Sequence, residues 1–329
     1  MHILYAKGEF IPGSVYQINS VVTFGATSVI YDVTDIVLGV RRIVKILSAG
    51  KGPSFDRRML REWQMLAGFD HPNIVRVVAA GRTTDQHRLP YYVMERLEGQ
   101  DLRRWLKGPG KFPVDRALSI TSDILCGLQA AHARGILHRD VKPENVFLRR
   151  APSSPWYEVK LLDFGCARWT QQPSSDALIG TLNYVAPELL DGARASEKSD
   201  VYAVGVTLYE MLTGRHPFGH LPISTRRGPP QALSETIDAP EDLTVLVVAA
   251  LSPTPDERIQ TVREFATRLA QVSHRWANRH LLDVTTDVDT LVAEKAPSTL
   301  RIPSAPKIDD ACDACDDDDE PDEGAPSSR

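Results

Sequence analysis

The stretch from His138 to Asn145, with the sequence HRDVKPEN, places three groups that could do chemistry together in one short segment. Asp140 supplies a carboxylate, Lys142 a cation and Asn145 an amide oxygen, at spacings of two and five residues. Transfer of a phosphoryl group needs these types: a carboxylate to orient the attacking hydroxyl, a cation for the moving group, and an oxygen ligand for a metal ion. The stretch therefore indicates phosphoryl transfer rather than a surface loop of mixed charge.

A second carboxylate, Asp163 in the sequence Asp-Phe-Gly, follows the apolar run from Val159 to Leu162. A strand that ends in Asp-x-Gly places a carboxylate where it can bind magnesium. The three-residue motif alone is also consistent with a simple turn. Its position eighteen residues after Asn145 predicts that the two residues serve one site.

Lys45, in the apolar segment RIVKIL, is a third candidate. A lysine in an apolar strand is most often a solvated edge residue. However, Glu62 lies on the next predicted helix, and HPNIV at 71–75 begins nine residues after it. An ion pair between Lys45 and Glu62 would hold the lysine against nucleotide phosphates.

Together with Ala186-Pro187-Glu188, these motifs resemble the signature set of the eukaryotic-type (Hanks-type) protein serine/threonine kinases. The segments HRDVKPENVFL, GTLNYVAPE and MLTGRHPF are most similar to the bacterial members, and the resemblance covers roughly residues 16–272. It implies an α+β, two-lobed protein-kinase fold, with a small β-rich N-lobe and a larger helical C-lobe. It also implies transfer of the ATP γ-phosphoryl group to Ser/Thr hydroxyls of protein substrates.

The resemblance assigns roles to the catalytic groups. Asp140 is the catalytic carboxylate, Lys142 contacts the γ-phosphate, and Asn145 and Asp163 hold Mg²⁺, with Mn²⁺ as an alternative. Lys45 and Glu62 belong to the ATP site. Asp200 braces the catalytic loop, and Glu188 pairs with Arg258.

The resemblance also places the adenosine part of ATP. Met94 is the gatekeeper beside the adenine, the backbones of Glu95 and Leu97 bond its edge, and Asp101 suits a ribose hydroxyl. The other members of the predicted nucleotide site are Gly25, Ile30 and Ile43.

Two departures from the family pattern concern this nucleotide site. The Gly-x-Gly-x-x-Gly loop is reduced to its middle glycine, Gly25, between Thr23 and Ser28, and a larger side chain, Ile43, replaces the usual alanine. They motivate the alternative of a pseudokinase scaffold with weak or no catalysis. The full set of catalytic groups favours an enzyme, and the long loop that ends in Ala-Pro-Glu disfavours a small-molecule kinase.

The segment from Asp163 to Glu188 resembles an activation loop. Arg139 lies beside the catalytic Asp140, and the resemblance implies that kinases with an arginine at this position are controlled by phosphorylation. Thr170, Ser174 and Ser175 are the candidate acceptors. We expect Ser175 to be an activating site of autophosphorylation, made through transient self-association. The resemblance implies that Thr181 contacts Asp140. Cys166 follows the Asp-Phe-Gly motif directly; a free cysteine is usually a small buried packing residue, and redox control is the alternative.

Composition limits the other function classes. The chain has 329 residues, of which 42% are hydrophobic and 25% charged, and four cysteines make no disulfide framework, which favours a cytoplasmic location. The longest apolar run, at 245–251, is too short to span a membrane, and the segment MHILYAKGEF lacks a signal-peptide pattern, so we expect no membrane partner. The net charge of −5 includes ten acids and one arginine in 309–329, and the slight basic excess elsewhere does not indicate a nucleic-acid partner.

Apolar periodicity outlines the elements. It predicts strands within 15–47 and at 74–80 and 90–97, and helices at 54–69, 115–134, 200–213, 241–251 and 261–279. We divide the chain into an N-terminal extension (1–15), a kinase domain (16–272, N-lobe about 16–98 and C-lobe about 99–272), a helical extension (273–295) and a disordered acidic tail (296–329). The tail is rich in Pro, Ser and Asp, which cannot form a packed core.

Overall fold

The computed structural model describes residues 5–25, 28–47, 63, 66–150, 157–164, 183–219, 228 and 230–294, the last fifteen of them by backbone alone. The described residues up to Leu281 belong to one compact unit, and every contact reported below lies within it. No helix in the described ranges is both long enough and apolar enough to cross a membrane.

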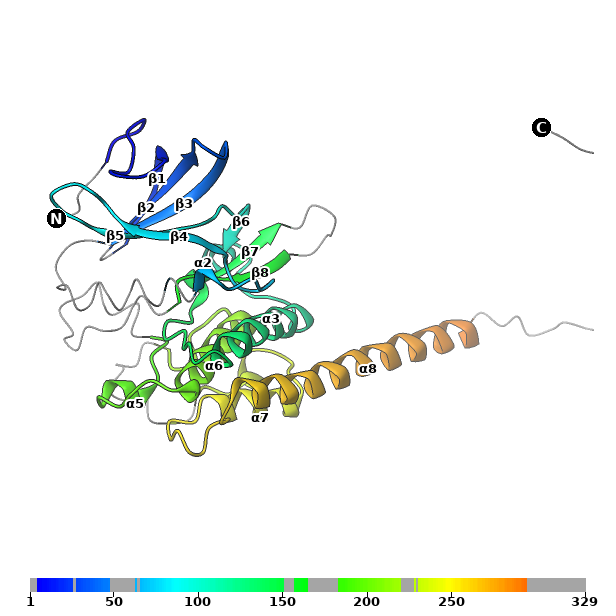
Figure 1. The fold of residues 1–329 in the computed structure, drawn as a ribbon. Helices are drawn as coiled ribbons and strands as arrows, with labels where there is room; N and C mark the ends of the chain where they lie inside the picture. Colours follow the sequence, from blue (N-terminus) through cyan, green and yellow to red (C-terminus); the bar gives the residue numbers. More distant parts are fainter. Residues whose placement is uncertain are drawn as a thin grey trace, which may run out of the picture. The chain divides into compact units, whose positions relative to one another are not determined.

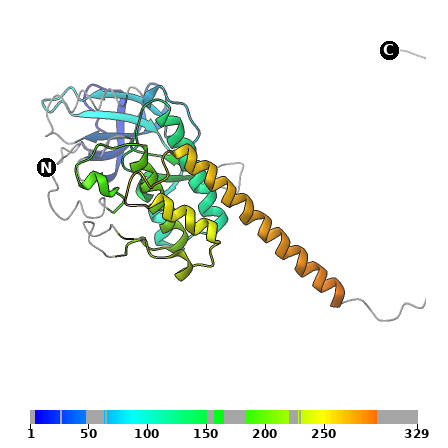
Figure 2. The same ribbon diagram turned by 90° about the horizontal axis from the view of Figure 1, so that it is seen from below.

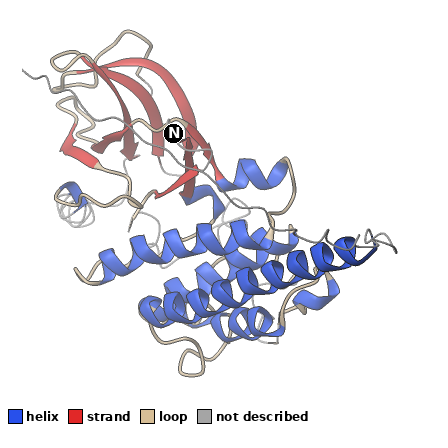
Figure 3. Ribbon diagram, turned by 90° about the vertical axis from the view of Figure 1, so that its right-hand side faces the viewer, coloured by secondary structure: helices blue, strands red, loops and turns tan. Residues whose placement is uncertain are grey.

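The N-terminal part is a five-stranded antiparallel sheet, drawn in red in Figure 3. Its strands are β1 (Tyr16–Gly25), β2 (Ser28–Asp35), β3 (Val40–Leu47), β4 (Val77–Arg82) and β5 (Pro90–Glu95), in the order β1-β2-β3-β5-β4. One face buries a small core that includes Tyr31, Val33 and Val44, each fully buried. The other face turns Lys45 and Tyr92, partners in the β3–β5 register, toward the rest of the molecule.

Helices make up most of the C-terminal part (Figures 1 and 2). They are α2 (Leu102–Lys107), α3 (Val114–His132), α5 (Pro187–Leu190), α6 (Glu197–Thr213), α7 (Glu241–Ala250) and α8 (Val262–Glu294), with 3-10 turns η1 (Pro143–Asn145) and η4 (Leu233–Glu235). A small sheet, in the order β6 (Gly99–Asp101), β7 (Val146–Arg150) and β8 (Tyr157–Leu161), lies beside them. The hairpin of β7 and β8 sets the spacing between Asn145, just before β7, and Asp163, just after β8.

Helix α6 forms the centre of the helical part, because every residue from Ser199 to Thr213 is buried. A capping box between Ser196 and Ser199 fixes where it begins. Gly214 ends it in the left-handed region at φ 71°, where a Cβ would lie 2.6 Å from the carbonyl oxygen of Gly110. The helix therefore starts at a defined point, which places Asp200 in its first turn under the catalytic loop.

The observed elements confirm the predicted α+β organisation, a β-rich part followed by a helical part. The segment 15–47 forms three strands, and the four predicted helices of the C-terminal part are present with shifts of a few residues at most positions. One end differs more, because β4 begins at Val77 rather than at residue 74. Helix α8 continues to Glu294, through the segment predicted as a helical extension (273–295). Most of the predicted helix at 54–69 lies outside the described residues.

Candidate active site

The catalytic loop brings its three predicted groups together. The Nζ atom of Lys142 lies 2.8 Å from Oδ2 of Asp140. The Nδ2 atom of Asn145 donates to the same oxygen and to the backbone carbonyl of Asp140, both at 2.8 Å. Asp140 is 8% exposed. The amide of Asn145 and the cation of Lys142 therefore orient its carboxylate before any substrate binds.

Asp200, at the start of α6, holds the backbone of this loop. Its two carboxylate oxygens accept hydrogen bonds from the backbone N–H of His138, at 2.9 Å, and of Arg139, at 2.8 Å. Arg139 has φ 67°, an unfavourable conformation for a non-glycine residue, which these bonds stabilise. The predicted bracing role of Asp200 is thus confirmed.

The environment of Asp200 keeps it charged. Burial alone would raise the pKa of this carboxyl, but the hydrogen bond from His132 and the nearby histidines outweigh burial and lower the pKa. The Nε2 atom of His132, on α3, lies 2.8 Å from Oδ2 of Asp200. Burial would lower the pKa of His132, and the same carboxylate, with Glu197, raises it. His132 therefore supports the catalytic loop through Asp200, a role that the sequence analysis did not assign.

Asp163 lies opposite the catalytic loop and is held at both carboxylate oxygens. Its Oδ2 atom is 2.7 Å from Nζ of Lys45, and its Oδ1 atom accepts a hydrogen bond from the hydroxyl of Tyr92. Burial would raise the pKa of Asp163, but the charge of Lys45 and these hydrogen bonds lower it. The sequence predicted Glu62 as the partner of Lys45, and Glu62 lies outside the described residues, so the contact of Lys45 with Asp163 is a finding of the structure.

Phe164, the next residue, connects this carboxylate to the catalytic loop. Its ring is 2% exposed and packs against His138 with 4.5 Å between the ring centroids. His138 is fully buried, and burial lowers the pKa of its imidazole. The contact fixes the start of the segment after Asp163 against the loop that carries Asp140.

The donor set suits a hard divalent cation. The two hydrogen bonds from Nδ2 of Asn145 fix which way the amide faces, and leave its oxygen as the atom that can bind a metal. Asp163 supplies carboxylate oxygens. Two oxygen ligands from the protein, completed by phosphate and water, are typical of magnesium sites. Asn145 and Asp163 would hold the ion, as the sequence predicts.

The hydrophobic residues predicted around the adenine lie on neighbouring strands. Ile43 on β3 pairs with Met94 on β5, and Ile30 on β2 pairs with Lys45. Met94 is 6% exposed, and Ile43 packs against the main core. Gly25 ends β1, where an added Cβ would lie 2.8 Å from the hydroxyl oxygen of Ser28. A side chain at position 25 would therefore need the hydroxyl of Ser28 to move.

The residues from Glu95, at the end of β5, to Asp101 are the ones predicted to bond adenosine, and two of their polar groups already have partners within the protein. The backbone N–H of Glu95 donates to the carbonyl of Arg76 at 3.0 Å, so this group serves the protein and only the carbonyl of Glu95 could meet an adenine. The carboxylate of Asp101 caps α2 by accepting from the N–H of Arg104 at 2.8 Å. Leu97 packs against the main core. Bonds from Leu97 and Asp101 to adenosine stay predictions.

A buried cluster around Arg103, which the sequence pattern did not indicate, ties four segments together. The guanidinium of Arg103 on α2 lies 2.8 Å from Glu144 in the catalytic loop and 2.5 Å from Glu210 on α6, and it also bonds the hydroxyl of Tyr184. Tyr184 in turn donates to Glu210. Tyr184 precedes Ala186-Pro187-Glu188 by two residues, so the cluster joins that motif to the catalytic loop.

A second ion pair confirms the predicted contact between Glu188 and Arg258. Both guanidinium nitrogens of Arg258 bond the carboxylate, at 2.8 and 2.9 Å, and the Arg258 side chain is fully buried. Other residues fall outside the described ranges: Glu62 and the activation-loop residues Cys166, Thr170, Ser174, Ser175 and Thr181. Their predicted roles stay predictions.

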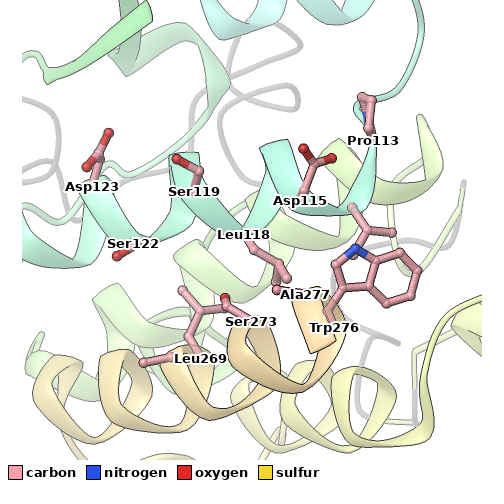
Figure 4. Close-up of a pocket in the computed structure, with 12 residues that line it drawn as sticks. Pro113, Asp115, Leu118, Ser119, Ser122, Asp123, Leu269, Ser273, Trp276 and Ala277 are labelled. Atoms are coloured by element: carbon pink, nitrogen blue, oxygen red, sulfur yellow. The ribbon is translucent and has the colours of Figure 1, made fainter. Parts of the chain in front are cut away.

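A cavity of about 800 Å³ between α3 and α8 is separate from these groups. Leu118, Leu269 and Trp276 are among the residues that line it, and so are Asp115, Ser119 and Asp123, whose side chains point away from α8 (Figure 4). Its polar side chains do not converge, so it offers no arrangement for catalysis. The chemistry of the molecule lies at the cluster of Asp140, Asp163 and Lys45.

Comparisons with known proteins agree with this geometry. A family model described as "Protein kinase domain" matches residues 16–275. The serine/threonine-protein kinase PknB of Mycobacterium leprae is 36% identical over 289 residues, which are 83% of this chain and 45% of that protein, so the chain spans less than half the length of this relative. The crystal structure of the Mycobacterium tuberculosis PknI kinase domain superimposes with a TM-score of 0.67 at 28% identity, covering 82% of this chain and all of that one. A structure of Rad53 residues 1–466 with AMP-PNP gives a TM-score of 0.63 at 26% identity, covering 77% of this chain and 64% of that one.

Proposed function

Because the chain belongs to the Hanks-type protein kinase family and is of the serine/threonine kind found in bacteria, we propose that it transfers the γ-phosphoryl group of ATP to Ser/Thr hydroxyls of protein substrates. The observation that carries the proposal is the preformed group of Asp140, Lys142 and Asn145, oriented by short hydrogen bonds and braced by Asp200. The chemistry of phosphoryl transfer is mostly positioning and charge stabilisation, and this arrangement supplies both.

Each side chain has a separate task in the reaction. Asp140 accepts a hydrogen bond from the substrate hydroxyl and takes its proton as the new O–P bond forms, while the bond from the γ-phosphorus to the bridging oxygen breaks and ADP leaves. Lys142, 2.8 Å away, offsets the negative charge that gathers on the transferred group. Lys45 supplies a second cation, for the nucleotide phosphates. A divalent cation held by Asn145 and Asp163 would neutralise charge on the phosphate oxygens.

We propose ATP with Mg²⁺, or Mn²⁺ as a substitute, as the phosphoryl donor. The oxygen ligands Asn145 and Asp163 support a hard cation. The similarity to Rad53, whose structure contains the ATP analogue AMP-PNP, supports the nucleotide. Lys45, Asp140, Lys142, Asn145 and Asp163 are all described and lie in this site, which gives no support to the pseudokinase alternative.

The decisive experiment is incubation of the purified chain with labelled ATP, magnesium and a generic protein substrate. We expect incorporation of phosphate into serine and threonine, and a loss of at least about 10²-fold in Asp140→Asn. The proposed function would be contradicted if wild type incorporated no labelled phosphate, or if Asp140→Asn incorporated as much as wild type.

We further propose activation by autophosphorylation at Ser175, made by one molecule on another. Arg139, next to Asp140, provides a guanidinium near the site, and a phosphoserine would add about −1.5 to −2 charges that such groups bind. Mass spectrometry of wild type and Asp140→Asn, with kinetics of Ser175→Ala, tests this. Absence of phosphate on Ser175, or full activity of Ser175→Ala, would favour a constitutively active enzyme.

We also propose a cytoplasmic location and protein substrates as the partners. The four cysteines and the modest, dispersed charge outside the acidic tail support this proposal. Cell fractionation followed by immunoblotting tests the location, and recovery of the chain in the membrane fraction would contradict it.

A further inference from the structure

Tyr92 on β5 is placed to act on Asp163, although the proposed mechanism does not yet use it. In the register of β3 and β5, Tyr92 pairs with Lys45, so both side chains leave the same face of the sheet. Lys45 reaches Oδ2 of Asp163 at 2.7 Å, and the hydroxyl of Tyr92 donates to Oδ1. One oxygen of the carboxylate thus forms an ion pair with a cation, and the other accepts a hydrogen bond from a neutral donor.

The ring of Tyr92 is itself fixed. Tyr92 is 2% exposed, and its ring packs against fully buried Trp63 with 4.8 Å between centroids. An aromatic ring with two torsions, packed in this way, carries its hydroxyl to a defined point. A phenylalanine would keep the packing and lose the hydrogen bond, and a flexible side chain would lose the fixed position.

Asp163 needs such support for two reasons. Its backbone has φ 58°, a region that non-glycine residues occupy only when their surroundings enforce it. In addition, a carboxylate bound at one oxygen can still rotate about its Cβ–Cγ bond, whereas contacts at both oxygens prevent rotation. Under the proposed function the charge of Lys45 is also directed at nucleotide phosphates, so the contact with Tyr92 adds a second anchor for the Asp163 carboxylate.

We propose that Tyr92 is a positioning residue, whose hydroxyl orients the Asp163 carboxylate for the divalent cation that accompanies the nucleotide. This inference rests on the proposed function, because it concerns the same metal ligand. A neutral hydroxyl suits the task, since it directs the carboxylate without the repulsion that a second positive group would exert on the cation.

The test compares Tyr92→Phe with a matched control, Tyr91→Phe. Tyr91 is the next residue, is also buried at 8% exposure, and belongs to the small core on the opposite side of the sheet. Binding of a fluorescent ADP analogue to each purified full chain is titrated once with magnesium and once with EDTA. For Tyr92→Phe we expect the dissociation constant to rise roughly tenfold with magnesium, the scale of a lost hydrogen bond to a charged group, and to stay unchanged in EDTA. Tyr91→Phe should match wild type in both.

The outcomes separate this inference from the proposed function. A dissociation constant that is unchanged in Tyr92→Phe with magnesium, or that rises equally with and without it, would overturn the positioning role, since a merely structural residue has no reason to depend on the metal. Kinase assays on the same samples give the second readout, in which we expect a fall in kcat of roughly tenfold for Tyr92→Phe. Wild type that binds the nucleotide but transfers no phosphate would contradict the proposed function and leave the binding result on Tyr92 standing.

Discussion

At the scale of single residues, function in this molecule depends on charges that are held in place before substrate binds. Asp163, whose side chain is 17% exposed, and fully buried Asp200 stay ionised because hydrogen bonds and cations outweigh the cost of burial and lower their pKa values. Asp163 forms an ion pair with Lys45 and accepts a hydrogen bond from Tyr92. Asp200 forms hydrogen bonds with His132 and with two backbone N–H groups. One faces the reaction, and the other supports the loop that performs it.

Lys45→Met and Asp163→Ala should each abolish phosphoryl transfer. Each residue supplies charge to the nucleotide or its metal, and the loss of such a contribution costs about 10²–10³ in rate or more. Turnover of labelled ATP by the purified variants is the measurement. Circular dichroism establishes that they are folded, and normal turnover by either folded variant would contradict the assigned role.

The pair of His132 and Asp200 predicts a dependence of stability on pH. The pKa of His132 is raised in the folded chain, so its contribution is fully present below its ordinary value of 6.5 and is lost as the pH rises through the folded-state pKa. We therefore expect the difference in free energy of unfolding between wild type and His132→Gln to be largest below pH 6.5 and to shrink at alkaline pH. Urea denaturation between pH 5.5 and 9 measures it.

His138 titrates in both proteins of that comparison, so its own effect on stability cancels in the difference. His274→Gln, at an exposed position on α8, is the matched control. A difference for His132→Gln that grows as the pH rises would show that the ion pair with Asp200 does not form.

At the scale of elements, the site depends on contacts between segments that are distant in sequence. Arg103 on α2 joins the catalytic loop, α6 and the segment that carries Tyr184. Asp200 on α6 meets the loop at His138 and Arg139. Both contacts reach the loop from a helix, and a rigid helix is a better support than a second loop.

Arg103→Ala should destabilise the protein. It leaves the carboxylate of Glu210, which is 8% exposed, without its cation, and removal of one partner from a buried pair costs about 3 kcal/mol. The neighbouring variant Arg104→Ala is the control, since that side chain is 75% exposed and its loss should change stability by less than about 0.5 kcal/mol. Equal midpoints in urea for the two variants would mean that the Arg103 cluster adds nothing to the fold.

At the scale of the whole molecule, the described residues up to Leu281 belong to one compact unit, and the acidic C-terminal sequence lacks the composition to form a core of its own. Deletion of residues 296–329 should therefore leave the thermal midpoint and turnover on a generic substrate unchanged. The reason is composition, because a segment rich in Asp, Pro and Ser cannot bury enough apolar surface to fold on its own. A large fall in the thermal midpoint of the truncated chain would show that this segment packs on the domain.

Much of the fold followed from periodicity alone. Alternation at 15–47 predicted the strands β1 to β3, and helical spacing predicted α3, α6, α7 and α8, because these elements bury one face or are buried throughout. The short elements were not resolved individually: α2, β6 and the 3-10 turns span three to six residues each, too few for a period to show. The spacing alone placed the end of the last helix of the domain near 279, and the segment predicted as a helical extension (273–295) continues it as the end of α8.

By itself, the sequence determined the chemical groups of the active site. Asp140, Lys142 and Asn145 are neighbours in the chain, so one loop brings them together in any fold that contains it, and the motif around Asp163 identified a fourth member. Only the tertiary structure decided what holds these groups. Tyr92, His132 and Arg103 carry no sequence signal, because an aromatic residue in an apolar strand and charged residues on helices are equally typical of packing and of solvent. Their roles arise from contacts between residues that are far apart in the chain. Tyr92 is separated from Asp163 by 71 positions, His132 from Asp200 by 68, and Arg103 from Glu210 by 107. Sequence spacing cannot specify contacts over such separations, since they depend on how strands and helices pack in three dimensions.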